Sequence, residues 1–80
     1  MIKTLIIDDE VKSQSTLHKL LEEYCSEVEV IGFAHNVKSG IEAINSLQPD
    51  LVFLDISMPD GDGFEVLDKV ENRNFEVVFT

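Results

Sequence analysis

Short apolar runs alternate with amphipathic segments along the chain of 80 residues. The apolar runs, which we expect to form strands, occupy residues 2–8, 28–33, 51–55 and 75–80. Parallel strands need crossover connections of about a dozen residues or more, and these are usually helices. The alternation therefore predicts an α/β fold with a doubly wound parallel sheet, built from right-handed crossovers.

Three segments between the strands carry apolar residues at helical spacing. The stripes are Leu17, Leu20, Leu21 and Tyr24 in the first, Val37, Ile41, Ile44 and Leu47 in the second, and Phe64, Val66, Leu67 and Val70 in the third. Asn36 is a favoured N-cap for the second helix, and Pro49 should end it. The segment Ser57–Gly63 contains one proline and two glycines, so it predicts a loop.

Two of the apolar runs end abruptly in acidic residues. Asp8 and Asp9 follow the first run, and Asp55 follows the third. The carboxyl ends of parallel strands lie at one edge of the sheet, where open α/β sheets bind their ligands. We therefore expect the three carboxylates to converge at that edge.

Converging carboxylates repel one another. At about 4 Å and an effective dielectric constant of about 20, each like-charged pair costs on the order of 4 kcal/mol. Such a cluster is tolerated when a cation lies among the carboxylates or when one of them binds a proton. The sequence therefore predicts a metal site with acidic oxygen ligands, built around one reactive aspartate.

Composition limits the partners that this segment can bind directly. The formal net charge is −10, from 16 acidic against 6 basic residues, and this balance disfavours nucleic acid or an anionic membrane surface. The single cysteine, Cys25, excludes an intrachain disulfide and is expected at the core or its boundary. No stretch resembles a signal peptide or a membrane span, so a cytoplasmic location is expected.

The last apolar run also bears on domain organisation. The chain stops inside Val77-Val78-Phe79, and an uncovered apolar edge strand is a liability that folds normally avoid. We therefore expect residues 1–80 to be one domain that is truncated after its fourth strand, with the remainder on a longer chain or supplied by another chain. The five phenylalanines are candidates for its core.

Two motifs resemble those of bacterial response-regulator receiver domains. Ile7-Asp8-Asp9-Glu10 is similar to their acidic pair, and Leu54-Asp55-Ile56-Ser57-Met58-Pro59 with Gly61 and Gly63 is similar to their phosphoacceptor loop. The spacing of the motifs and the order of elements match as well. The resemblance covers the whole chain but only about two thirds of a receiver. The overall sequence is most similar to receivers of LytTR-type transcription regulators.

The resemblance implies a flavodoxin-like receiver fold, of which this chain has about four strands and three helices. It implies that Asp55 is the phosphorylation site and that Mg²⁺ is the cofactor. It implies that Asp9, Asp55 and the backbone carbonyl of Ser57 are direct ligands of the metal. Asp8 would support them through a water or a hydrogen bond. Pro59 and Gly63 would shape the loop, and Gly63 would open the third helix.

The function implied is that of a two-component phosphoacceptor and not that of an enzyme beyond slow self-dephosphorylation. A sensor histidine kinase would donate the phosphoryl group, a second receiver could form a homodimer, and DNA would be reached only through an output domain outside this chain. Receivers also use a hydroxyl residue after the fourth strand and a lysine after the fifth. Thr80 lies near the position of this hydroxyl residue, but the family's usual motif places that residue one position later.

Other interpretations remain open at this stage. A Mg²⁺-dependent phosphatase with an aspartyl nucleophile, of the haloacid-dehalogenase type, usually needs a second aspartate where this chain has Ser57. A receiver-like interaction module would act without phosphorylation. Asp8 and Asp9 could simply cap the first helix. Residues 60–63 lack the further ligands of a calcium loop, so a turn and helix cap is expected there.

Overall fold

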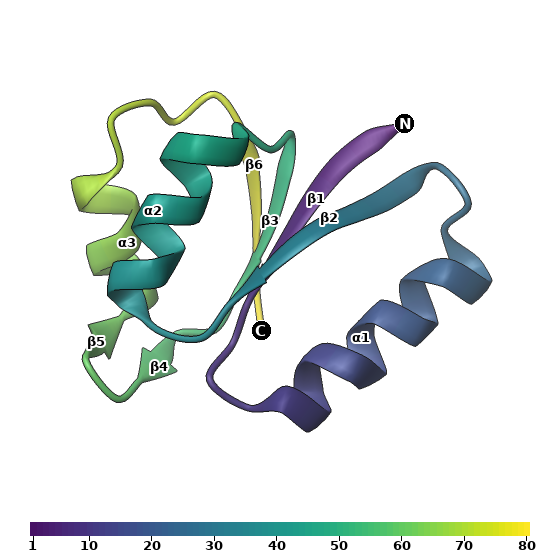
Figure 1. Ribbon diagram of the computed structural model, residues 1–80, viewed down its shortest axis with the longest axis horizontal. Helices are drawn as coiled ribbons and strands as arrows, with labels where there is room; N and C mark the ends of the chain where they lie inside the picture. Colours follow the sequence, from purple (N-terminus) through teal and green to yellow (C-terminus); the bar gives the residue numbers. More distant parts are fainter.

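Four parallel strands form the central sheet of the computed structural model, which describes residues 1–80. In chain order the elements are β1 (Ile2–Ile7), α1 (Val11–Tyr24), β2 (Val28–Ala34), α2 (Val37–Leu47), β3 (Leu51–Leu54), β4 (Ser57–Met58), β5 (Gly61–Asp62), α3 (Gly63–Lys69) and β6 (Glu76–Phe79). The sheet order is β2-β1-β3-β6. Figure 1 shows α1 on one face of the sheet and both α2 and α3 on the other. The predicted doubly wound α/β fold is therefore confirmed.

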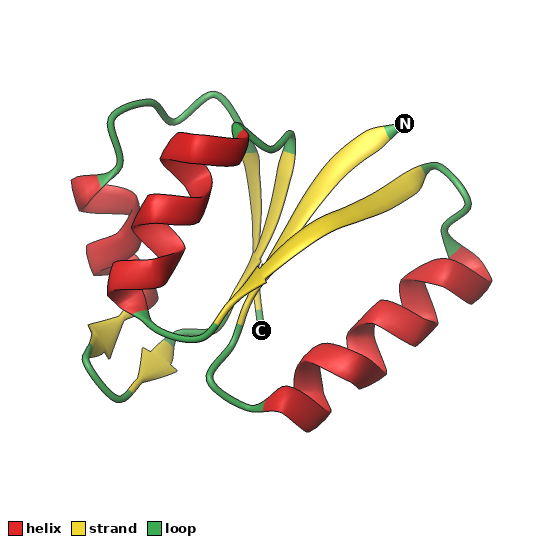
Figure 2. Cartoon of the chain, in the orientation of Figure 1, coloured by secondary structure: helices red, strands yellow, loops and turns green.

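The register of the sheet aligns the carboxyl ends of β1 and β3. Ile7 lies opposite Leu54 in this parallel pair, and Leu54 lies opposite Phe79 in the next. Because all three strands run in the same direction, the residues that follow them leave the sheet at one edge. Figure 2 shows this edge as the place where the loops after β1 and β3 begin.

The main core fills the space between the sheet and the α2–α3 layer. Its ten buried residues are Leu5, Ile7, Ala34, Val37, Ile44, Val52, Leu54, Met58, Val66 and Val70. Alternate residues of each strand point to this face, which is why Leu5 and Ile7 enter the same cluster. Burying each large aliphatic side chain contributes about 1.5–3 kcal/mol. This layer therefore fixes the strand ends that carry the acidic residues.

The face that α1 covers is less closed than the sequence suggests. Leu21 is buried, but Leu20 is 47% exposed and Tyr24 is 77% exposed. The expectation that all five phenylalanines belong to the core is wrong: Phe33, Phe64 and Phe79 are exposed, and Phe53 and Phe75 are only partly buried. Phe33 and Phe79 lie on β2 and β6, the two outer strands of the sheet. Phe64 lies in the short helix α3, where its ring packs against that of Phe79. Residues at the edges of the sheet have neighbours on fewer sides, so their rings stay partly open to solvent.

Two local expectations need correction. The segment 57–63 is not only a loop, because Ser57 and Met58 pair with Asp62 and Gly61 in a small antiparallel hairpin. Pro59 lies in the turn of this hairpin, between Met58 and Gly61, where its missing N–H matters little. Cys25 is exposed and not at the core boundary, because it lies just past the end of α1.

The N-terminus of α2 is capped as the sequence predicts. The Asn36 side chain accepts the backbone N–H of Ser39 at 2.8 Å, and the Ser39 hydroxyl accepts the N–H of Asn36 at 3.2 Å. This reciprocal pair is a capping box. No helix in the structure combines the length and apolar character needed to cross a membrane.

Candidate functional site: an acidic cluster at the sheet edge

Asp8 and Asp55 are brought side by side by backbone hydrogen bonds that continue the sheet beyond its strands. The N–H of Asp55 donates to the carbonyl of Ile7 at 2.9 Å, and the N–H of Asp8 donates to the carbonyl of Ala34 at 3.0 Å. These bonds hold both residues in line with β1 and β3 while their side chains leave the sheet. The convergence expected from the two motifs therefore has a backbone cause.

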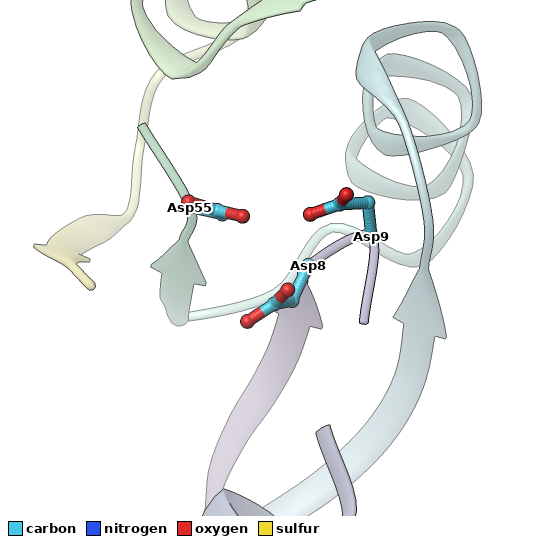
Figure 3. A group of neighbouring side chains, drawn as sticks. All are labelled: Asp8, Asp9 and Asp55. Carbon is cyan, nitrogen blue, oxygen red and sulfur yellow. The ribbon is translucent and has the colours of Figure 1, made fainter. Parts of the chain in front are cut away.

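Three carboxylates meet at this position. Asp8, Asp9 and Asp55 each offer one oxygen, and these oxygens all lie within 4.8 Å of one another. Figure 3 shows Asp9 and Asp55 pointing towards each other, with Asp8 beside them at the end of its strand. Asp8 and Asp55 are half-buried, whereas Asp9 is exposed. A cation entering from solvent would thus meet a pocket whose ligands are already assembled.

The electrostatic environment raises the pKa of Asp55 above that of an ordinary aspartate. Burial is the largest cause, because it disfavours the charged form. The neighbouring Asp9 and Asp8 raise the pKa further, while a hydrogen bond from the N–H of Ser57 opposes the shift. The raised pKa makes Asp55 easier to protonate, and a cation bound beside it would favour its charged form instead.

Short-range hydrogen bonds hold the two acidic loops. The N–H of Glu10 donates to Oδ1 of Asp8 at 2.9 Å, and the N–H of Ser57 donates to Oδ1 of Asp55 at 3.2 Å. Ser57 itself lies in β4 and is exposed. It is therefore next to the cluster, and its observed backbone contact with Asp55 is through the N–H.

Gly63 allows the start of α3 to approach the backbone of Asp55. Its N–H donates to the carbonyl of Ile56 at 2.8 Å. A Cβ atom at this position would lie 2.8 Å from the backbone oxygen of Asp55 and 3.1 Å from Cγ of Leu54. Backbone atoms cannot move away as a flexible side chain can, so glycine is required by this close approach. Gly63 begins α3, as expected.

An open groove adjoins the acidic cluster on the α1 side. It has a volume of about 540 Å³, and Asp8, Asp55 and Thr80 are among its lining residues. The N–H of Thr80 donates to the carbonyl of Leu54 at 3.0 Å. Thr80 therefore follows β6 in the same way that Asp55 follows β3, and it lies on the same sheet edge.

Two side chains with structural contacts, Gln14 and Asp60, were not identified from the sequence. Gln14 is buried in α1 and bonds to the ends of two strands, although its spacing from Leu17 and Leu21 does place it on the apolar face of the helix. Asp60 binds the N-terminus of α2. No local pattern predicts that contact, because the two partners are brought together only by the fold.

Comparisons with known proteins agree with this arrangement. The family model described as the response regulator receiver domain matches residues 4–80. The chain is 40% identical over 82 residues to the transcriptional regulatory protein BtsR of Escherichia coli, covering 100% of this chain and 34% of BtsR. It is 43% identical over 75 residues to the sensory transduction protein LytT of Bacillus cereus, covering 90% of this chain and 30% of LytT. The chain thus spans about a third of the length of the curated relatives it matches.

Solved structures agree in fold. The response regulator domain of CheB from Thermotoga maritima superposes with a TM-score of 0.88 at 26% identity, over 99% of this chain and 59% of that one. The match includes the parallel sheet and the three helices that carry the acidic edge. With a family model covering nearly the whole chain and close relatives among response regulators, the chain belongs to the response regulator receiver domains of two-component systems.

Proposed function

We propose that this chain is a Mg²⁺-dependent phosphoacceptor whose Asp55 receives a phosphoryl group from a sensor histidine kinase. The observation that carries the proposal is the convergence of Asp8, Asp9 and Asp55 within 4.8 Å. A single strand-ending aspartate would be an ordinary loop residue. Three carboxylates together, at the edge where α/β sheets bind their ligands, form a group that could hold a cation.

The donor set fits a small hard cation. Carboxylate oxygens are the protein ligands that Mg²⁺ prefers, and the site is open enough for the metal to keep bound water. We assign Asp9, Asp55 and the Ser57 backbone carbonyl as direct ligands and Asp8 as a supporting group. When bound, the metal neutralises the cluster and stabilises negative charge on a transferring phosphoryl group.

The chain's own residues supply the nucleophile and its alignment. An oxygen of Asp55 forms a bond to phosphorus as the phosphorus–nitrogen bond of the kinase phosphohistidine breaks. The histidine nitrogen keeps the electron pair of that bond and can then take up a proton. Phosphoryl transfer depends mainly on positioning and charge stabilisation, and the Ser57 N–H holds one Asp55 oxygen in place during the approach.

The consequences of phosphorylation extend beyond these residues. An aspartyl phosphate adds a group with a charge of about −2 and new acceptor oxygens to the sheet edge. Such a group can bias a two-state surface by attracting nearby donors. We propose that the reader of this change is an output domain outside the chain, and that it binds DNA as a transcription regulator does. The similar protein BtsR is a transcriptional regulatory protein.

The proposal is tested by covalent modification. The full-length protein is incubated with Mg²⁺ and acetyl phosphate, and its intact mass is measured. We expect the mass of one added phosphoryl group, no such addition when EDTA is present throughout the incubation, and none in Asp55→Asn. The control Asp68→Asn changes an exposed acid of α3 outside the cluster and should retain the adduct.

Other results would favour other functions. Rapid multiple turnover of small phosphate esters would identify a phosphatase and contradict an acceptor role. An absence of both adduct and Mg²⁺ binding would favour a receiver-like interaction module. An adduct that persists in Asp55→Asn would place the reactive group elsewhere and overturn the assignment.

A further inference from the structure

Gln14 is a polar side chain in a position where an apolar one would be expected. It lies on the inner face of α1 and is only 5% exposed. Burying an amide without hydrogen bonds costs on the order of 1–3 kcal/mol in proteins. Hydrogen bonds offset this cost, and one of them is made to the backbone of Asp8 in the acidic cluster.

The side-chain nitrogen of Gln14 joins the ends of two strands. It donates to the carbonyl of Asp8 at 2.8 Å and to the carbonyl of Ala34 at 2.9 Å. An amide NH₂ has two hydrogens, so both are used by these acceptors. Nδ1 of His35 lies 3.5 Å from the same nitrogen. Gln14 therefore ties α1 to the carboxyl ends of β1 and β2.

The carbonyl that Gln14 holds belongs to the peptide unit between Asp8 and Asp9. That unit is planar, so fixing its oxygen limits the rotation of both flanking residues. The N–H of Glu10 restrains the same turn by bonding to the Asp8 carboxylate at 2.9 Å. Without such restraints, repulsion among the three acids would favour turning Asp9 out towards solvent.

We propose that Gln14 is a positioning residue for the acidic cluster: its bond to the Asp8 carbonyl holds the Asp8–Asp9 turn in the orientation that binds a divalent cation. The proposal rests on the proposed function in naming the cation. Groups that orient metal ligands typically change metal affinity about 10–100-fold when they are removed. Gln14 acts on the backbone of the ligand loop and does not itself contact the metal position.

The test compares two variants of the full-length protein by Mg²⁺ titration. Gln14→Met keeps the size of the side chain but removes both donors, and we expect its Kd for Mg²⁺ to rise about tenfold or more. Thr4→Val is the matched control, because Thr4 is also fully buried in β1 and donates to the carbonyl of Ile2 at 3.1 Å. Its Kd should be unchanged even where urea unfolding shows an equal loss of stability.

A second measurement needs no variant. The side-chain NH₂ signals of Gln14 should shift in the NMR spectrum on saturation with Mg²⁺, while those of the exposed Gln48 should stay in place. This measurement remains decisive if Gln14→Met fails to fold. Phosphorylation of Asp55 is measured separately by intact mass.

The outcomes separate the two proposals. If the natural protein binds Mg²⁺ and forms the Asp55 adduct, but Gln14→Met binds as tightly or the Gln14 signals do not move, the positioning role is overturned and the phosphoacceptor function stands. Equal weakening in Thr4→Val would also overturn it, because the effect would then be one of stability. If the natural protein binds no Mg²⁺, both proposals fail together.

Discussion

The carboxylate of Asp60 accepts the backbone N–H of Val37 at 2.8 Å, across 23 residues of sequence. Its second oxygen accepts the N–H of Lys38 at 3.2 Å. Asn36 caps the next free donor, that of Ser39, so the hairpin after β3 and the first turn of α2 form one bonded unit. A negative charge at this helix end is also favoured by the helix dipole.

We expect Asp60→Ala to lower the urea midpoint of unfolding, because two donors of the first turn of α2 lose their partner. Asp60→Asn keeps one acceptor oxygen, so its urea midpoint should lie between those of Asp60→Ala and the natural protein. The control is Asp68→Asn, whose midpoint should stay unchanged. Equal midpoints for Asp60→Ala and the natural protein would show that water replaces the carboxylate without loss.

The same contact predicts a pH dependence. The hydrogen bonds from Val37 and Lys38 hold the pKa of Asp60 below the usual carboxyl range. For an acid whose folded pKa is depressed, the stabilisation is present above the unfolded pKa and is lost as the pH falls through the folded pKa. The midpoint difference between natural protein and Asp60→Asn should therefore shrink as the solution is made acidic below the ordinary carboxyl range. A difference that grows in acid would contradict this sign.

Crowding of the acids predicts that Asp55→Asn stabilises the metal-free fold. The substitution removes one charge from a cluster whose oxygens lie within 4.8 Å. For partly solvated charges at this distance the gain is on the order of 0.5–1 kcal/mol, after allowance for screening by water. Urea unfolding in EDTA measures it. A variant that unfolds at lower urea than the natural protein in EDTA would count against repulsion at this site.

Mg²⁺ should stabilise the folded protein, because the unfolded chain has no assembled cluster. At a free concentration of 100 times Kd, the expected gain is about 2.7 kcal/mol. Thermal unfolding with and without the metal gives the shift, which Asp9→Asn should reduce and Asp68→Asn should keep. A shift of the same size in Asp9→Asn would remove Asp9 from the ligand set.

Gly63→Ala should disturb the site more than its size suggests. The new Cβ would lie 2.8 Å from the backbone oxygen of Asp55, and relieving such an overlap costs roughly 1–3 kcal/mol. We expect both a lower urea midpoint and weaker Mg²⁺ binding, since the backbone that moves carries Asp55. In the control Gly32→Ala the contact is the flexible end of Leu47 at 3.0 Å, so the metal affinity should be kept.

Patterns of single elements explain how much could be predicted from the sequence. Asn36 was recognisable as an N-cap because its partner, Ser39, is only three residues away. The strand ends at Asp8 and Asp55 were recognisable because apolar runs stop there. The burial of the phenylalanines was not, since Phe33 and Phe79 are apolar in type but lie on the two outer strands of the sheet, where they stay exposed.

The amino-acid sequence alone determined the order of strands and helices and the chemistry of the three acids, because hydrophobic periodicity and residue type act locally. Only the tertiary structure decided which carbonyls Gln14 would bind and which helix Asp60 would cap. Ala34 lies 20 residues from Gln14 in the sequence, and Val37 lies 23 residues from Asp60. Contacts at such separations depend on strand register and helix packing, which form only when the whole sheet is assembled.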